Sequence, residues 1–588
     1  MKSFKEVAAV LTILSIIIFL RAETKAAETD LKIFRQLTNE RTSTNRPALT
    51  AEIVKRDGPA IVSDARSPSR LSVDISGAVA YVPTLGAKLA IALWLDVPAR
   101  PQWWGAKCDG AALDTTAVRA AVSGAANARL RLAVSGTCLT GTVDVPSSTR
   151  IEAAQPGSGF KLATTTGPLL RVAAGADRVV VRGLMLDATN IDAAAVRNSR
   201  RSDGPGAVIY QPPGGNGGTI EISDTRVVGI YRPGGGTNAL ILNGAVARVT
   251  GNHVEATSGD ALNFNGGFAY VAGNHVSQSG DGCIAFNNGA RGVVIGNTLM
   301  RCDLAFGAGP EGHAADSDQV QSMVFANNTI EACRVGVNMG WYGYAEREGP
   351  VNWSVDNNLF RNCKQTAINY DGRATSWIAN GTITGNVISH LGAKDYDGAP
   401  GIDTYAIRMV NAGGLTVMGN RIYDPRGMGK QEGIYLLNTP KSALVANSIQ
   451  GGAINYNFAM WIIDSSDTAV TGNTVSAAQQ ILQATLTKPG ARYGLNVSGN
   501  IGSDISDSGI VFATNGSGFT IWTNQIDGGT GVGSGIGLPV VASDFTVGPN
   551  QIRWAGKSAI SDPPRRSWIN WQIRGNNTGN GSQPAGAN

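Results

Sequence analysis

Three aspartates at related positions of successive repeats are candidates for acid–base chemistry. Asp260, Asp281 and Asp303 each stand just before a short apolar segment. Hydrolysis of a glycosidic bond needs two carboxyl groups, one protonated and one ionised. Side chains alternate along a strand, so aspartates on neighbouring coils can point outward from one face, about 4.8 Å apart per rung. Close carboxylates raise one another's pKa, which favours a proton donor. The alternative interpretation is turn chemistry, because Gly-Asp pairs are common in turns.

A second set of residues fits elimination by a lyase. That reaction needs a base beside a uronate carboxylate and a cation that neutralises the carboxylate. Hard oxygen ligands for Ca²⁺, the candidate cofactor, are Asp395 and Asp397. The alternative interpretation is a solvated polar loop. The candidates for base and cation are His313, Lys394, Arg408 and Arg373.

Aromatic residues gather in the longest repeats. Repeats that begin at Asn252 and Asn274 are 22 and 23 residues long, whereas the next four are 28 to 34. Extra residues in a solenoid enter loops that often flank the binding face. Aromatic rings beside charged groups suit sugar rings, although some of them could instead pack the loops. We therefore expect a polysaccharide groove along the coils from Asn252 to Asn420. Its predicted substrate-binding residues are Trp341, Tyr342, Tyr370, Arg373 and Tyr396.

The elements that position these residues are repeats punctuated by asparagine. Each asparagine is followed by a short apolar segment, a polar turn and a second apolar segment. Strands this short bury a face only by stacking, which predicts an all-β, right-handed parallel β-helix. We expect the asparagine to adopt the left-handed backbone of a sharp turn and to bond the asparagine of the next coil. The repeated asparagines are Asn252, Asn274, Asn297, Asn328, Asn358, Asn386, Asn420, Asn447, Asn473 and Asn500.

The chain divides into four regions. Residues 1–26 have a positively charged start, an apolar run and small residues at the end, which predicts a cleaved export signal. Residues 27–100 lack the repeat and form an N-terminal extension. Residues 101–575 form the solenoid, with a helix that starts at Asp114-Thr115 and caps the first coil. Residues 576–588 form a Gly/Asn-rich flexible tail.

Composition and charge argue against two classes of protein, nucleic-acid binders and membrane-spanning proteins. The 588 residues include 75 glycines, only 16% are charged, and the formal net charge is +5 without a basic block. Nucleic-acid binding therefore has little support. No later stretch is apolar enough to span a bilayer. With the export signal, this predicts a protein of the bacterial periplasm or cell exterior.

The six cysteines do not form a Cys-x-x-Cys pair, so a zinc site is not expected. Cys333 and Cys363 are one repeat apart, which places them on neighbouring rungs. An oxidising compartment permits a disulfide there. We favour the alternative of stacked, buried thiols, because small apolar side chains suit the interior of a solenoid.

Two segments resemble the pectate-lyase-like superfamily of parallel β-helices. Residues 103–117, WWGAKCDGAALDTTA, are similar to its entry motif and capping helix. Residues 279–286, SGDGCIAF, resemble the polygalacturonase segment in which two aspartates precede a cysteine. The first of those aspartates falls on Asp281, and the second is replaced by Gly282. The resemblance, which covers residues 101–575, implies the β-helix fold.

These patterns together predict a carbohydrate-active protein that cleaves or modifies an extracellular, acidic polysaccharide. We slightly favour a lyase over a glycoside hydrolase, because the polygalacturonase motifs are broken. The alternative from another class is a non-catalytic polysaccharide binder or surface adhesin. Fold analogy does not decide between them, since one fold hosts many functions.

Overall fold

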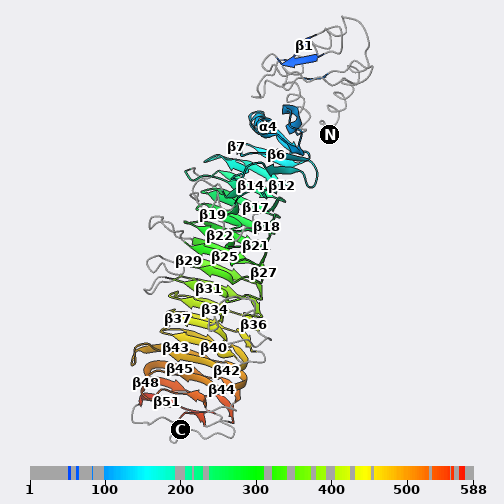
Figure 1. Ribbon diagram of the computed structural model, residues 1–588. Coiled ribbons are helices and arrows are strands. Elements are labelled where there is room, and N and C mark those ends of the chain that lie inside the picture. The colour runs from blue at the N-terminus through cyan, green and yellow to red at the C-terminus, as the bar shows by residue number, and fades with distance from the viewer. Residues whose placement is uncertain are drawn as a thin grey trace, which may run out of the picture.

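The computed structural model describes residues 51–54, 61–64, 82–83, 98–192, 206–214, 218–229, 237–309, 321–340, 351–372, 379–391, 404–423, 431–451, 456–528, 533–555, 558–561 and 568–576. From residue 98 onward, these residues form one long rod of stacked parallel strands (Figure 1). The rod confirms the predicted right-handed parallel β-helix. In the N-terminal region, β1 (Ala51–Val54) pairs antiparallel with β2 (Ile61–Asp64), and β2 pairs in parallel with β3 (Val82–Pro83).

Each coil contributes one strand to each of three faces of the rod. In chain order, a coil runs through face 1, face 2 and face 3, and each strand pairs in parallel with the equivalent strand of the next coil. Face 1 of the central coils consists of β17 (Val246–Thr250), β20 (Phe268–Ala272), β23 (Arg291–Ile295), β26 (Gln321–Ala326), β29 (Val351–Asp356), β32 (Thr382–Thr384), β35 (Thr416–Met418) and β38 (Ala443–Val445).

Face 2 consists of β18 (His253–Thr257), β21 (His275–Ser279), β24 (Thr298–Met300), β27 (Thr329–Glu331), β30 (Leu359–Arg361), β33 (Val387–Ser389), β36 (Arg421–Tyr423) and β39 (Ser448–Gln450). Face 3 consists of β19 (Leu262–Asn265), β22 (Gly282–Asn287), β25 (Leu304–Gly309), β28 (Val335–Met339), β31 (Thr366–Asp371), β34 (Thr404–Val410), β37 (Gln431–Leu437) and β40 (Tyr456–Ile463). In the C-terminal coils, β42 (Thr474–Thr485) and β44 (Ile501–Phe512) run through faces 2 and 3 without a break.

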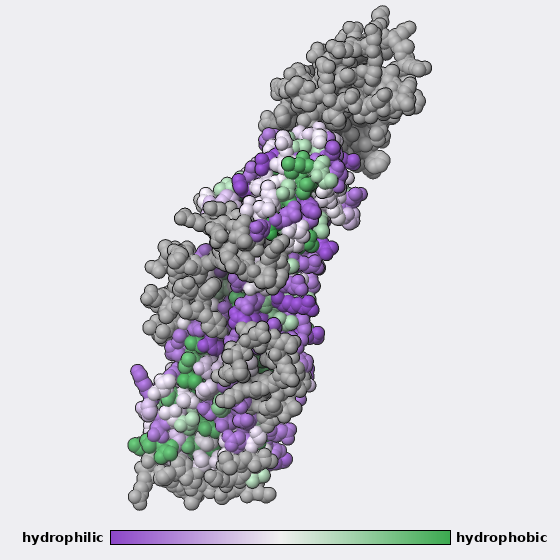
Figure 2. Space-filling model, viewed as in Figure 1, coloured by the Kyte–Doolittle hydropathy of each residue, from purple (hydrophilic) through white to green (hydrophobic). Residues whose placement is uncertain are grey.

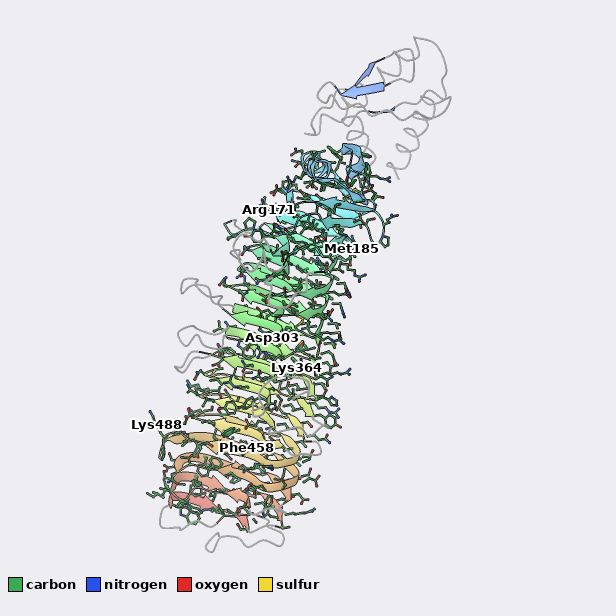
Figure 3. All side chains as sticks on the ribbon, in the orientation of Figure 1. Arg171, Met185, Asp303, Lys364, Phe458 and Lys488 are labelled. Carbon is green, nitrogen blue, oxygen red and sulfur yellow. A yellow bond between two sulfur atoms is a disulfide. The ribbon has the colours of Figure 1, made fainter. Side chains whose placement is uncertain are left out.

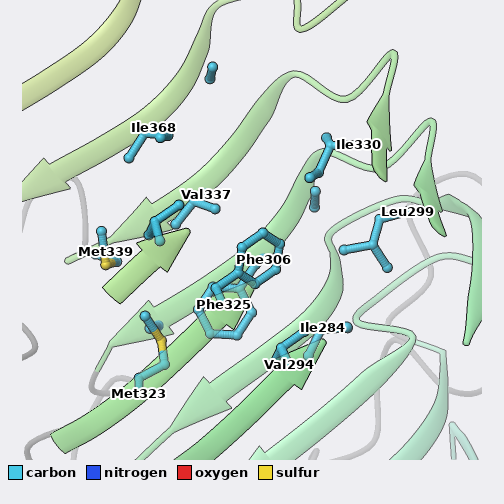
Figure 4. Close-up of a cluster of buried hydrophobic side chains, with 14 of the residues drawn as sticks. Ile284, Val294, Leu299, Phe306, Met323, Phe325, Ile330, Val337, Met339 and Ile368 are labelled. Carbon is cyan, nitrogen blue, oxygen red and sulfur yellow. The ribbon is translucent and has the colours of Figure 1, made fainter. Parts of the chain in front are cut away.

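The core is a narrow column of apolar side chains from all three faces. Ile284, Phe306 and Val337 of face 3 stack in register. They meet Phe325 of face 1 and Ile330 of face 2, and all five are fully buried (Figure 4). Because strands this short each bury only a few side chains in the core, stacking supplies the buried area that a single coil lacks.

An asparagine ladder runs along the corner between faces 1 and 2. The Oδ1 atom of Asn274 accepts hydrogen bonds from the backbone N–H and the amide of Asn252, both at 2.9 Å. The same pair of bonds recurs at each later rung, which confirms the predicted ladder and extends it to Asn576. The ladder consists of Asn252, Asn274, Asn297, Asn328, Asn358, Asn386, Asn420, Asn447, Asn473, Asn500, Asn524, Asn550 and Asn576.

The predicted left-handed conformation of the ladder asparagines is wrong. The residue before the asparagine takes it instead, with φ of 66° at Gly251, 54° at Asn327 and 52° at Ala446. The turn therefore needs two different residues in sequence, which explains the Gly-Asn pairs. Glycine adopts the left-handed turn without a steric penalty, and the asparagine side chain is left free to bond along the rod.

A helix closes the N-terminal end of the rod, as predicted (Figure 1). Helix α4 (Thr115–Asn127) buries Val118, Ala121 and Val122 against the first coil. The carboxylate of Asp114, the residue before the helix, does not cap it. It accepts the backbone N–H groups of Lys107 and Cys108, both at 2.8 Å, and so fixes the preceding turn.

Candidate functional site

Face 3 carries its polar residues outward on the central coils. In β28, Val337 and Met339 point into the core, so Asn338 between them lies on the outer side. Register then places the equivalent residues of later rungs on that side, from Asn369 through Arg408 and Tyr435 to Trp461. We call this row the outer row of face 3.

Asp260 and Asp281 lie together at the N-terminal part of face 3. Both line one hollow, with Gly282 and Ala285 of β22 and Asn338 of β28 among its other walls. Asp260 is 9% exposed and Asp281 is half-buried. The two carboxylates come from successive coils: Asp260 precedes β19, Asp281 precedes β22, and these two strands pair directly with each other. The hollow lies within the stretch predicted from the lengths of the repeats.

Asp260 is held by two hydrogen bonds. Its Oδ1 accepts the backbone N–H of Gly282 at 2.9 Å, and its Oδ2 accepts the Nδ2 of Asn263 at 2.8 Å. Both bonds favour the ionised carboxylate. A side chain at Gly282 would meet this carboxylate, since a Cβ built there lies 2.5 Å from Asp260 Oδ1. The glycine that replaces the second aspartate of the polygalacturonase motif therefore makes room for Asp260.

Asp303 lies on the next coil but takes part in an ion pair. Arg334 of the following rung contacts both of its oxygens, at 2.6 and 2.8 Å, and also donates to Gln365 at 2.9 Å. A two-pronged guanidinium contact of this kind is a strong, charge-assisted pair of hydrogen bonds. Asp303 does not line the hollow of Asp260 and Asp281. The predicted proton-donor pair of Asp303 with either aspartate is therefore not supported.

Arg408, a candidate for the lyase cation, sits on β34 in the outer row of face 3. Its Nη1 donates to Asn369 Oδ1 at 2.9 Å and lies 3.5 Å from Asp371 Oδ2. Asn369 in turn donates to Asn338 Oδ1 at 2.7 Å, so amides connect Arg408 to the wall of the hollow. Burial raises the pKa of Asp371 above the ordinary value, although Arg408 opposes the shift.

Tyr370, which was predicted to bind substrate, lies in the core of the rod. Its side chain has no exposed surface and stacks on Trp353, with ring centroids 5.6 Å apart. The alternation along β31 turns Tyr370 inward and Asp371 outward. The prediction that Tyr370 binds substrate is therefore wrong. The other predicted site residues lie outside the described residues: His313, Trp341, Tyr342, Arg373, Lys394, Asp395, Tyr396 and Asp397.

A disulfide joins the two coils beneath the hollow. Cys283, two residues after Asp281, is bonded to Cys302 beside Asp303. A second disulfide joins Cys108 to Cys138 near the capping helix. The sequence did not predict either bridge.

Cys333 and Cys363 are buried free thiols, as expected for stacked side chains in the interior of the solenoid. Burial raises the pKa of the Cys333 thiol to about 12. These two cysteines are therefore neutral packing groups at physiological pH.

Within the described part of the chain, only Cys108, Asp114 and Cys138 bring three ligand atoms close enough together to hold a metal ion. The two thiols are joined to each other, so this group does not fit a metal. The predicted Ca²⁺ ligands lie outside the described residues. No helix in the described ranges is long and apolar enough to cross a membrane.

Comparison with known proteins identifies the family. A family model described as the right-handed beta helix region matches residues 214–383 and 347–536, which together make up more than half of the chain. The chain therefore belongs to the right-handed β-helix family. No curated protein matches the sequence.

Solved structures with a similar fold come from several sources. The N-terminal fragment of bacteriophage phi29 gene product 12 is 11% identical, with a TM-score of 0.46, over 81% of this chain and 86% of that one. An exopolygalacturonase from Thermotoga maritima is 10% identical, with a TM-score of 0.31, over 71% and 90%. The surface adhesin PfbA of Streptococcus pneumoniae is 12% identical, with a TM-score of 0.29, over 83% and 94%. At these identities, the likeness concerns the fold.

Proposed function

We propose that this protein is an exported glycoside hydrolase that cleaves a polysaccharide at the hollow between Asp260 and Asp281. The observation that supports the proposal is the presence of two carboxylates from successive coils at one outward hollow. Two carboxyl groups that flank the bond are the minimal equipment for glycoside hydrolysis. Both disulfides fit an oxidising compartment outside the cytosol.

The two carboxylates have different surroundings and therefore different roles. Asp260 accepts two hydrogen bonds that favour its ionised form, so it is the group that activates water or attacks the sugar. Asp281 is more exposed and supplies the proton to the departing glycosidic oxygen. After the step, the bond between the sugar carbon and that oxygen is broken, and water has contributed a hydroxyl to one product and a proton to the other.

Hydrolysis suits face 3 better than elimination does. A lyase needs a cation that is available to neutralise the uronate carboxylate. Arg334 and Arg408, two arginines on the central coils of this face, already contact Asp303 and Asp371. The cations that a lyase would need are then Lys394 and Arg373, outside the described residues. An acidic substrate stays a prediction, and the slight preference for a lyase gives way to hydrolysis in our proposal.

The proposal is tested with purified full-length protein and a panel of polygalacturonate, alginate and a neutral glucan, with and without Ca²⁺. New reducing ends without ultraviolet absorbance from unsaturated uronates are the expected result. Asp281→Asn and Asp260→Asn should each lower the rate about 100-fold or more, the usual contribution of a general acid or base. The matched control is Asp527→Asn, an exposed carboxylate of β46 (Gln525–Gly528). Full activity of both site variants, or unsaturated products, would contradict the proposal.

A second candidate function is polysaccharide binding without catalysis. The replacement of the second motif aspartate by Gly282 favours it. Binding to a polysaccharide of the panel, without release of reducing ends or unsaturated products, is the result that this candidate predicts.

A further inference from the structure

Four aromatic rings form a cluster on the outer side of face 3, on rungs beyond the hollow. They come from three successive strands: Tyr405 from β34, Tyr435 from β37, and Phe458 and Trp461 from β40. The ring centroids of Tyr405 and Tyr435 are 5.0 Å apart, those of Tyr435 and Trp461 are 5.3 Å apart, and those of Phe458 and Trp461 are 5.0 Å apart. We call these four residues the aromatic platform.

The platform lies outside the core. Ile434 and Leu436 of β37 are fully buried in the core, so Tyr435 between them points outward. Met460 and Ile462 flank Trp461 in the same way. All four rings of the platform are half-buried, so each keeps some surface that water or a ligand can reach. Hydrophilic side chains cover much of the visible surface of the middle coils (Figure 2).

The platform continues the same column of strands as the hollow. Register runs directly from Arg408 to Tyr435 and on to Trp461, in the outer row of face 3. Phe458 belongs to the neighbouring row, which also contains Tyr405 and runs back through Leu304, the residue after Asp303, to Gly282 at the hollow. Asp303 and Phe458 are both labelled in Figure 3. From β28, at the wall of the hollow, to β34 is two rungs, or about 10 Å along the rod.

The chemistry of the platform fits a sugar ring. Aromatic planes pack against the C–H faces of a pyranose, while polar groups at the edge bond its hydroxyls. Here the edge groups are the guanidinium of Arg408, the carboxylate of Asp371 and the hydroxyl of Thr485, to which the Trp461 Nε1 donates at 3.4 Å. The rung spacing of about 4.8 Å is close to the length that one hexopyranose adds to an extended glycan.

We infer that the aromatic platform is a glycan subsite that holds the polysaccharide chain four or more rungs away from the Asp281 carboxylate, where the bond is cleaved. The ligand class is a run of hexopyranose units stacked on Tyr435 and Trp461. The inference rests on the proposed function only for the kind of ligand. Asn369 has no exposed surface, so it positions Arg408 between the platform and the hollow and does not contact the glycan.

The test measures glycan binding separately from cleavage. The full-length Asp281→Asn variant is titrated calorimetrically with polygalacturonate, alginate and a neutral glucan. In that background, Trp461→Ala and Tyr435→Ala should each raise Kd about tenfold, a change of about 1.4 kcal/mol. Trp461→Phe should retain most of the affinity, because it keeps an aromatic plane. The matched control is Trp522→Ala, which removes a tryptophan that is 42% exposed on face 1, in β45 (Gly516–Trp522). Urea midpoints verify that each variant is folded.

The outcomes separate this inference from the proposed function. Unchanged Kd in both alanine variants overturns the platform, whether or not the wild type cleaves the glycan. Ring-dependent binding by a wild type that does not cleave supports the platform and contradicts the hydrolase. Absence of binding to every polysaccharide of the panel overturns both. A loss equal to that of Trp522→Ala also overturns the platform, because it marks a general effect of removing surface tryptophan.

Discussion

Replacement of one ladder asparagine by alanine should destabilise the rod by several kilocalories per mole. The Asn358 side chain makes four buried hydrogen bonds. Its Oδ1 accepts from the backbone N–H and the amide of Asn328, at 2.9 and 3.0 Å, and its Nδ2 donates to Phe325 O and Asn386 Oδ1, at 2.9 and 3.0 Å. At about 1 kcal/mol net for each bond, Asn358→Ala should cost about 4 kcal/mol.

The assay combines urea denaturation with hydrogen exchange. Stability in a solenoid is a sum of local and nearest-neighbour contributions, so the loss should concentrate in the flanking coils. The backbone amide of Asn328, which loses its acceptor, should exchange faster than those of remote rungs. Asn358→Asp retains the acceptor oxygens but cannot donate when ionised, so its defect at neutral pH should be at least as large as that of Asn358→Ala.

The control for this experiment is Asn496→Ala, which alters an exposed asparagine in β43 (Arg492–Ser498). A surface substitution of this kind should stay within about 0.5 kcal/mol of the wild type. The reasoning is refuted if Asn358→Ala is as stable as Asn496→Ala, or if its faster exchange is spread evenly along the rod.

Three further predictions concern the cysteines and one histidine. Reduction of the Cys283–Cys302 disulfide should lower the urea midpoint by an amount equivalent to about 3 kcal/mol, because the bridge closes a loop between residues 19 apart; an unchanged midpoint would show that the bridge adds nothing. Cys333 and Cys363 should resist a thiol reagent at pH 8 until urea is added. The reason is that burial raises the pKa of both thiols, that of Cys333 to about 12. Rapid labelling of the folded protein would be inconsistent with their burial. Burial lowers the pKa of His275, so folding favours its neutral form. The free energy of unfolding should therefore fall as the pH drops from about 6.5 through the lowered pKa. A His275→Gln variant with the same pH profile would exclude this group as the cause.

The repeat and the ladder could be predicted because they depend on local, recurring residue types. An asparagine before each short apolar segment implies that equivalent amides meet on successive rungs. The left-handed position was misassigned because Gly and Asn both tolerate it, and only the backbone shows that Gly251, not Asn252, adopts it.

The site was harder to predict, because its contacts connect repeats of unequal length. Asp281 was found from its motif, whereas the Arg334 partner of Asp303 is 31 residues away and no pattern in the sequence aligns the two. Tyr370 was predicted to lie in a loop of a long repeat, whereas it lies in strand β31 and faces the core. The lengths of the repeats did not indicate the platform residues Tyr435 and Trp461, because both lie in shorter repeats beyond the long ones.

The structure of the Asp281→Asn variant with a bound oligosaccharide, from whichever polysaccharide the wild type cleaves, tests the central claim most directly. We predict that the sugar chain lies along face 3, with a glycosidic oxygen beside residue 281, Asp260 on the opposite side of the sugar, and further rings over Tyr435 and Trp461. An oligosaccharide bound to face 1 or face 2, with the hollow of face 3 empty, would contradict the account.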